Sequence, residues 1–149
     1  MFYPKALSAY KETKVQTAGQ GQLILMLYDE AIKQLDQGLD LLKQYAKGRN
    51  DPGKIENIAK ALLKAQEIIT ELQVSLDFEQ GGEIAKNLFS LYAWFNQEII
   101  ESNITKDVPR VADVRAMLAD LRSAWVEAAK AASAETPPPE PRRGVNIAY

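Results

Sequence analysis

Four long stretches of the chain repeat apolar residues every three or four positions, which is the spacing of one face of an α-helix. The first stretch runs from about Thr17 to Ala46. Thr17 and Gln20 have the spacing of a capping box at its start. Its apolar face is broad and consists of Leu23, Ile24, Leu27, Tyr28, Ala31, Leu35, Leu39 and Leu42.

The second stretch follows the polar segment KGRNDPGK. In that segment Asp51 suits the N-cap of a helix and Pro52 suits its first turn. The apolar residues that follow form a narrow seam with a seven-residue repeat, as in antiparallel bundles and coiled coils. The seam consists of Ile55, Ile58, Leu62, Ala65, Ile69, Leu72 and Leu76.

The third stretch follows the segment DFEQGGE at 77–83. The adjacent glycines Gly81 and Gly82 predict a tight turn between two helices, with positive φ angles at the glycines. The main apolar stripe of the helix contains Ile84, Leu88, Leu91, Phe95 and Ile99. Since Phe89, Tyr92 and Trp94 lie off this stripe, we expect the helix to be apolar on more than one side.

The fourth stretch begins near Asp107 and Pro109, and its apolar pattern fades near Ser133. Its apolar positions are Val111, Val114, Leu118, Leu121, Trp125 and Ala128. Trp125 lies on this seam, so we expect it in the core. Trp94 fits no seam, and it either contacts a partner at the surface or packs beneath a terminal segment.

Short polar loops between long helices make consecutive helices antiparallel neighbours. The sequence therefore predicts an all-α protein, an antiparallel up-down four-helix bundle over residues 17–133. An N-terminal arm at 1–16 and a Pro-rich tail at 134–149 lie outside the bundle. The prolines of the tail rule out a helix and favour an extended chain. Its last residues, RRGVNIAY, are either a docking segment or a tolerated appendage.

Composition excludes several classes of function. The chain has 149 residues, enough for one domain with a real core, and a formal charge of −2, which leaves no basic field for nucleic acid. It contains no cysteine, which excludes disulfides, thiolate nucleophiles and thiolate metal sites, and no histidine, the commonest general base and transition-metal ligand. We therefore expect no catalytic residues, metal or cofactor.

Two smaller sets of residues invite a chemical interpretation. Glu67 and Glu71 could belong to a carboxylate-bridged metal site, but such helical sites also use histidine, so we expect both on a solvated face. Tyr28 and Tyr92 have no partner base, and we expect their rings at the edge of the bundle with solvated hydroxyl groups.

The start of the chain, MFYPKALSAYKETK, lacks the apolar run of a signal peptide. No run of about 18 apolar residues suggests a membrane span. A cytoplasmic location is the expectation that follows.

Several motifs occur together along most of the chain. They are QLILMLYDEA at 22–31, SLDFEQGGEIAKNL at 75–88, LRSAW at 121–125, and Ala9-Tyr10 with Val15 near the start. In combination they resemble the FliS family of flagellin export chaperones over about residues 7–127. One departure is the segment AGQG at 18–21, where the family often has a proline-containing cap. Because glycine weakens a helix, we expect the first helix to begin late or to kink there.

The resemblance implies a cytoplasmic chaperone for flagellar type III export. Family members are antiparallel bundles that bind the C-terminal region of flagellin, which is disordered in the free monomer and becomes helical along the chaperone. Binding blocks premature filament assembly, and the chaperone delivers flagellin to a component of the export gate. The N-terminal segment is implicated in both steps, which directs attention to Leu7 and Tyr10.

A chaperone of this kind needs apolar surface beyond its own core. We predict grooves that the N-terminal arm partly covers in the free chain, and protein-binding residues Leu7, Tyr10, Leu23, Leu27, Leu63, Phe89 and Tyr92. A helical adaptor or self-associating bundle for another protein partner, including a homo-oligomer, would also need exposed apolar grooves. An enzyme built on a carboxylate-bound metal is the second alternative.

Overall fold

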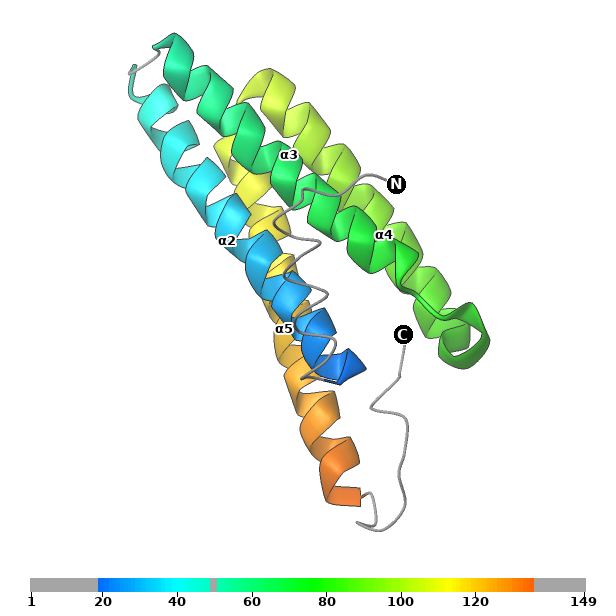
Figure 1. Cartoon of the computed structure of the whole chain (residues 1–149). Helices are drawn as coiled ribbons and strands as arrows, with labels where there is room; N and C mark the ends of the chain where they lie inside the picture. Colours follow the sequence, from blue (N-terminus) through cyan, green and yellow to red (C-terminus); the bar gives the residue numbers. More distant parts are fainter. Residues whose placement is uncertain (1–18, 49–50, 136–149) are drawn as a thin grey trace.

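The computed structural model describes residues 19–48 and 51–135, and these residues form four helices without any strand (Figure 1). The helices are α2 (Gln20–Ala46), α3 (Pro52–Val74), α4 (Phe78–Thr105) and α5 (Val108–Glu135). The predicted all-α bundle is therefore confirmed. The predicted arm at 1–16 and nearly all of the predicted tail lie outside the described residues.

The four helices pack as a ring in chain order. Helix α2 contacts α3 and α5, and α4 contacts the same two helices, so α2 and α4 lie diagonally across the bundle. At the end where α4 begins and α5 stops, the α3/α4 pair diverges from the α2/α5 pair (Figure 1). The bundle is therefore closed at one end and splayed at the other.

Aspartate side chains cap the starts of α3 and α4, and a third, Asp107, caps the start of α5. Asp51 accepts a hydrogen bond of 2.8 Å from the backbone N–H of Lys54, and Asp77 accepts bonds from Glu79 and Gln80 at 3.0 and 3.1 Å. Each cap satisfies backbone donors that a helix start leaves without a partner. Helix α2, by contrast, begins at Gln20 after Gly19, which provides no side-chain cap.

The α3–α4 connection is shorter than predicted. The segment 77–83 was expected to be the turn, but α4 already begins at Phe78, directly after the Asp77 cap. The backbone breaks at Gly82, with φ 50° and ψ −126°, and helical structure continues beyond it. The expected positive φ therefore occurs at Gly82, whereas Gly81 lies in the first helical turn.

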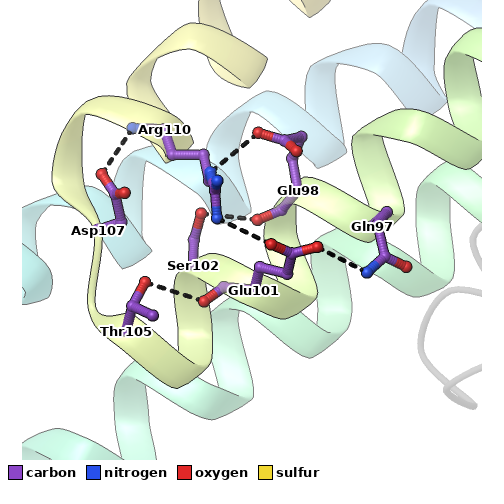
Figure 2. Close-up of polar contacts among 7 residues, drawn as sticks. All are labelled: Gln97, Glu98, Glu101, Ser102, Thr105, Asp107 and Arg110. Atoms are coloured by element: carbon purple, nitrogen blue, oxygen red, sulfur yellow. Dashed lines mark hydrogen bonds and ion pairs between the residues drawn. The ribbon is translucent and has the colours of Figure 1, made fainter.

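A charged cluster closes the α4–α5 turn at the other end of the bundle (Figure 2). Asp107 accepts a bond of 3.1 Å from the backbone N–H of Arg110. The Arg110 guanidinium pairs with Glu98 at 3.0 Å and with Glu101 at 3.2 Å. Because Arg110 lies on α5 and both carboxylates lie on α4, these contacts fix the register of the two helices.

Three large side chains form a hydrogen-bonded group in the core. The hydroxyl groups of Tyr28 and Tyr92 lie 2.6 Å apart, and the indole N–H of Trp125 donates to the Tyr28 oxygen at 3.2 Å. Trp125 in the core confirms the prediction. The expectation of solvated tyrosine hydroxyls was wrong, because the Tyr28–Tyr92 contact crosses the bundle between diagonal helices and is buried.

Three further positions differ from the sequence expectation. Ile55 and Ile84 belong to predicted seams but are exposed, because each lies near a helix start where a neighbouring helix gives incomplete cover. Glu71 was expected on a solvated face but is buried, because it shares the inward arc of α3 with Ile68 and Leu72. Glu67, one turn earlier, is half-buried.

Replacing Tyr92 with Phe removes one hydroxyl from the buried group while keeping the ring. We expect the free energy of unfolding to fall by about 1–3 kcal/mol, because the Tyr28 hydroxyl loses a buried partner. Urea unfolding followed by circular dichroism measures this change. Tyr45→Phe, at a half-buried position on α2, is the matched control and should change stability by less than about 0.5 kcal/mol. Equal effects of the two substitutions would contradict a special role for the buried pair.

Candidate protein-binding surface

The outward edge between α3 and α4 is aligned by two hydrogen bonds. The Asn96 amide donates to the Thr70 hydroxyl at 3.0 Å, and the Gln73 amide donates to the Phe89 carbonyl at 3.1 Å. In this antiparallel register, Leu63 lies near the level of Ile100. The α3/α4 edge thus has a continuous outer surface formed by both helices.

This edge carries large apolar side chains at matching spacings on both helices. Residues 63, 70 and 74 of α3, and 89, 96 and 100 of α4, follow the same i, i+7, i+11 pattern, which keeps each set on one helix face. Leu63 is 55% exposed and Phe89 is 43% exposed. We call the exposed apolar set the α3/α4 surface, and it consists of Leu63, Val74, Phe78, Phe89, Ile100 and Ile104.

Phe78 reaches this surface through the local backbone geometry of α4. The Asp77 cap starts the helix, and the break at Gly82 then separates the first turn from the rest of α4. The Phe78 and Phe89 rings contact each other with centroids 5.8 Å apart at an angle of 56°. Tilted aromatic contacts of this kind are favourable and hold both rings in place at the surface.

Polar residues divide the α3/α4 surface into two apolar parts. Thr70 receives the Asn96 amide and donates its own hydroxyl to the Gln66 carbonyl at 2.8 Å. Val74, Phe78 and Phe89 lie on one side of this polar pair, and Leu63, Ile100 and Ile104 lie on the other. Any partner that spans the whole edge must accommodate the polar pair between the two apolar parts.

The opposite edge of the bundle, between α2 and α5, is charged. Arg115 pairs with Asp36 at 2.9 Å, and Arg122 pairs with Asp29. Seven residues separate the members on each helix, so the two pairs form successive links along the edge. The α2/α5 edge thus carries ion pairs where the α3/α4 edge carries six exposed apolar side chains, and the other large exposed apolar residues, Ile55, Ile84, Trp94 and Met117, lie outside that set.

The structure separates the predicted protein-binding residues into three groups. Leu63 and Phe89 are exposed on the α3/α4 surface. Leu23, Leu27 and Tyr92 are buried in the core. Leu7 and Tyr10 lie outside the described residues.

The buried group has a simple physical reason. Helix α2 lies between α3 and α5, so two neighbouring helices cover a wide arc of its surface. The two apolar lines of this helix, Leu23/Leu27 and Ile24/Tyr28, are therefore both needed for the core. Tyr92 turns inward because its hydroxyl meets that of Tyr28.

Sequence reasoning missed four members of the α3/α4 surface, namely Val74, Phe78, Ile100 and Ile104. A usable signal existed for two of them. Ile100 and Ile104 stand one helical turn apart and off the main stripe of α4, as does Phe89. Phe78 gave no such signal, because its position depends on where the helix begins and breaks.

Within 19–48 and 51–135, no group of three or more acidic, histidine or cysteine residues is placed to hold a metal ion. Over the same residues, no helix combines the length and apolar character needed to cross a membrane. An all-helical bundle with an uncovered apolar edge is the class of structure that accepts amphipathic segments of other proteins.

Comparison with known proteins agrees with this class. The family described as "Flagellar protein FliS" matches residues 3–132. The flagellar secretion chaperone FliS of Vibrio cholerae is 35% identical over 80% of this chain and 85% of its own length. Those of Salmonella typhimurium and Escherichia coli are 32% and 30% identical, over 89% and 85% of this chain and 96% and 91% of their own lengths. The chain belongs to the FliS family.

Gly82→Ala tests the backbone geometry that positions Phe78. We expect the free energy of unfolding to fall by about 1–3 kcal/mol, because φ 50° with ψ −126° strains any residue with a Cβ atom. No atom lies within 4 Å of the added Cβ, so the loss comes from the backbone and not from a clash. Chemical denaturation measures it.

The matched control is Gly21→Ala, inside α2, where a Cβ atom also meets nothing within 4 Å. There we expect a gain of roughly 0.5–1 kcal/mol, because alanine favours a helix more than glycine does. If Gly82→Ala leaves stability unchanged or raises it as Gly21→Ala does, the strained geometry at Gly82 does not exist in solution.

Proposed function

We propose that this chain is a cytoplasmic export chaperone for flagellin. It binds the C-terminal region of flagellin, which is disordered before binding, and keeps it from polymerising too early. It then delivers flagellin to a component of the flagellar type III export gate. The chain catalyses no reaction in this process, and apolar contacts provide the free energy that holds the flagellin segment.

Family membership and the α3/α4 surface together support this proposal. The relatives that match the chain are named flagellar secretion chaperones. The single observation that carries the proposal is the exposed apolar edge on two adjacent helices, with Leu63 and Val74 on α3 and Phe89 and Ile100 on α4 each eleven residues apart. An amphipathic helix that lies along such an edge repeats its own apolar residues at a compatible spacing.

The energetics fit a client that folds as it binds. Ordering a disordered segment costs conformational entropy, so a large and mostly apolar contact is needed to offset it. Each exposed side chain of the α3/α4 surface is already partly covered, and covering the remainder contributes on the order of 1 kcal/mol. Six such residues along two helices make a larger favourable contribution to the binding free energy than a single small patch could.

Leu63 and Phe89 stand in the two apolar parts of the α3/α4 surface, and glutamate at either position tests the proposal. We expect Leu63→Glu and Phe89→Glu each to weaken binding of a flagellin C-terminal peptide by about ten-fold or more, because a charge replaces an apolar contact at a cost above ~1.4 kcal/mol. Isothermal titration calorimetry with the full chain measures the dissociation constant.

Met117→Glu is the control, since Met117 is an exposed apolar residue on α5, a helix that does not contact α3. This variant should bind within about two-fold of the unchanged chain, since surface substitutions away from a contact have small effects. Absence of micromolar binding by the unchanged chain would overturn the chaperone proposal. Equal weakening by all three variants would show that the α3/α4 surface is not the binding site for the peptide.

The N-terminal arm gives a second test, on positions that lie outside the described residues. We propose that Leu7 and Tyr10 contribute to holding and delivering flagellin, so the double change of Leu7→Ala and Tyr10→Ala should reduce both peptide binding and flagellin secretion. Calorimetry measures the first, and an immunoblot of secreted flagellin from a strain that depends on the variant measures the second. Ser8→Ala, between the two positions, should leave both unchanged. If the double variant also leaves both unchanged, the arm has no part in the function.

A further inference from the structure

The seam between α4 and α5 is not closed at the splayed end of the bundle. Ile84 belongs to the core stripe of α4 by its spacing, yet it is 48% exposed. Leu88 and Leu91, further along the same stripe, are half-buried, as is Leu121 on α5. Residues with core spacing remain exposed here because α5 diverges from α4 (Figure 1). A cover is therefore missing from this seam within the described residues.

The segment that follows α5 is placed to supply the cover. The Arg110 contact with Glu98 sets the register, so Ile84, fourteen residues before Glu98, lies level with Ala124 on α5. Glu135 ends the helix eleven residues later, about 16 Å beyond that level. An extended chain from Thr136 to Val145 spans roughly 28 Å, which exceeds this return and leaves length for crossing from α5 towards α4.

The composition of this segment matches the seam. In an extended chain Val145, Ile147 and Tyr149 lie on one side, because side chains alternate. Arg142 and Arg143 precede them. The first turns of α4 carry Asp77, Glu79 and Glu83 against Lys86, so their net charge is opposite to that of the arginine pair.

The N-terminal arm is a less direct candidate for the same place. It precedes α2, which lies diagonally across the bundle from α4 and is not one of the two helices that form the seam. The segment 136–149, in contrast, continues from one of the two helices that form the seam.

We propose that residues 142–149 dock in cis on the splayed α4/α5 seam. Val145, Ile147 and Tyr149 cover Ile84 and Leu88, and Arg142 and Arg143 lie beside the carboxylates of Glu79 and Glu83. A weak contact is enough to keep the segment bound for most of the time, because a short tether gives the segment a local concentration in the millimolar range. The docked segment completes the α4/α5 edge, whereas the α3/α4 surface on the other side of α4 stays open.

A nitroxide spin label tests this docking on the full chain without any client, so its outcome does not depend on the proposed function. The chain has no cysteine, and Asn146→Cys therefore gives a single labelling site, on the side of the extended segment that faces away from the seam. We expect the label to broaden the amide signals of Ile84 and Leu88 in NMR spectra, and to leave those of Leu63 and Ile100 unchanged.

The matched control carries the same label together with Val145→Ser, Ile147→Ser and Tyr149→Ser. We expect the signals of Ile84 and Leu88 to recover in this variant. Broadening that persists would mean that the segment is near the seam without specific contacts, and the proposal would be wrong. Broadening of Leu63 and Ile100 instead would place the segment on the α3/α4 surface and would also overturn it.

Two further samples distinguish other occupants of the seam. A mixture of labelled chain with unlabelled, ¹⁵N-enriched chain reports contacts between copies, and broadening in that mixture would overturn docking in cis. Leu7→Ser with Tyr10→Ser perturbs the arm and should leave the chemical shifts of Ile84 and Leu88 unchanged. If the arm variant shifts the signals of Ile84 and Leu88 and the triple serine variant does not, the arm and not the segment 142–149 covers the seam.

Discussion

The buried contact between the Tyr28 and Tyr92 hydroxyl groups determines how the bundle divides its apolar residues between inside and outside. Buried hydroxyl groups need partners, and here the partner of each is on the diagonally opposite helix, with Trp125 adding a third helix to the group. Because Tyr92 points inward, Phe95 and Ile99 follow it into the core. The apolar residues that remain on α4 must then point outward, which places Phe89 and Ile100 on the α3/α4 edge.

Local backbone chemistry refines this arrangement at the α3–α4 connection. Asp77 caps α4 so early that Phe78 becomes part of the helix, and Gly82 interrupts the helix one turn later. The result brings Phe78 against Phe89 and adds a second ring to the exposed edge. A general helix–helix turn would join the helices equally well. The particular cap and glycine matter because they extend the apolar surface beyond the end of α3.

The helices themselves could be predicted from sequence, because their apolar spacing and the signals at Asp51 and Asp107 are local. The core position of Trp125 could be predicted for the same reason. The exposure of Ile84 and the burial of Leu27 could not, because periodicity does not tell how wide an arc each helix buries. That width depends on the neighbouring helices. Helices α3 and α5 cover a wide arc of α2, whereas α5 diverges from the first turns of α4 and leaves them less covered.

The polar pair of Thr70 and Asn96 limits the consequences of leaving apolar residues exposed. An uninterrupted apolar strip along two helices would favour association of the chain with itself, and dividing it into two smaller parts reduces that tendency. Under the proposed function, the division also sets the mode of client binding. Each apolar part alone holds an unfolded segment weakly, and both are occupied together only when the client forms a continuous helix. The proposed function thus requires a client that becomes helical over the whole edge, because only such a client covers both apolar parts together.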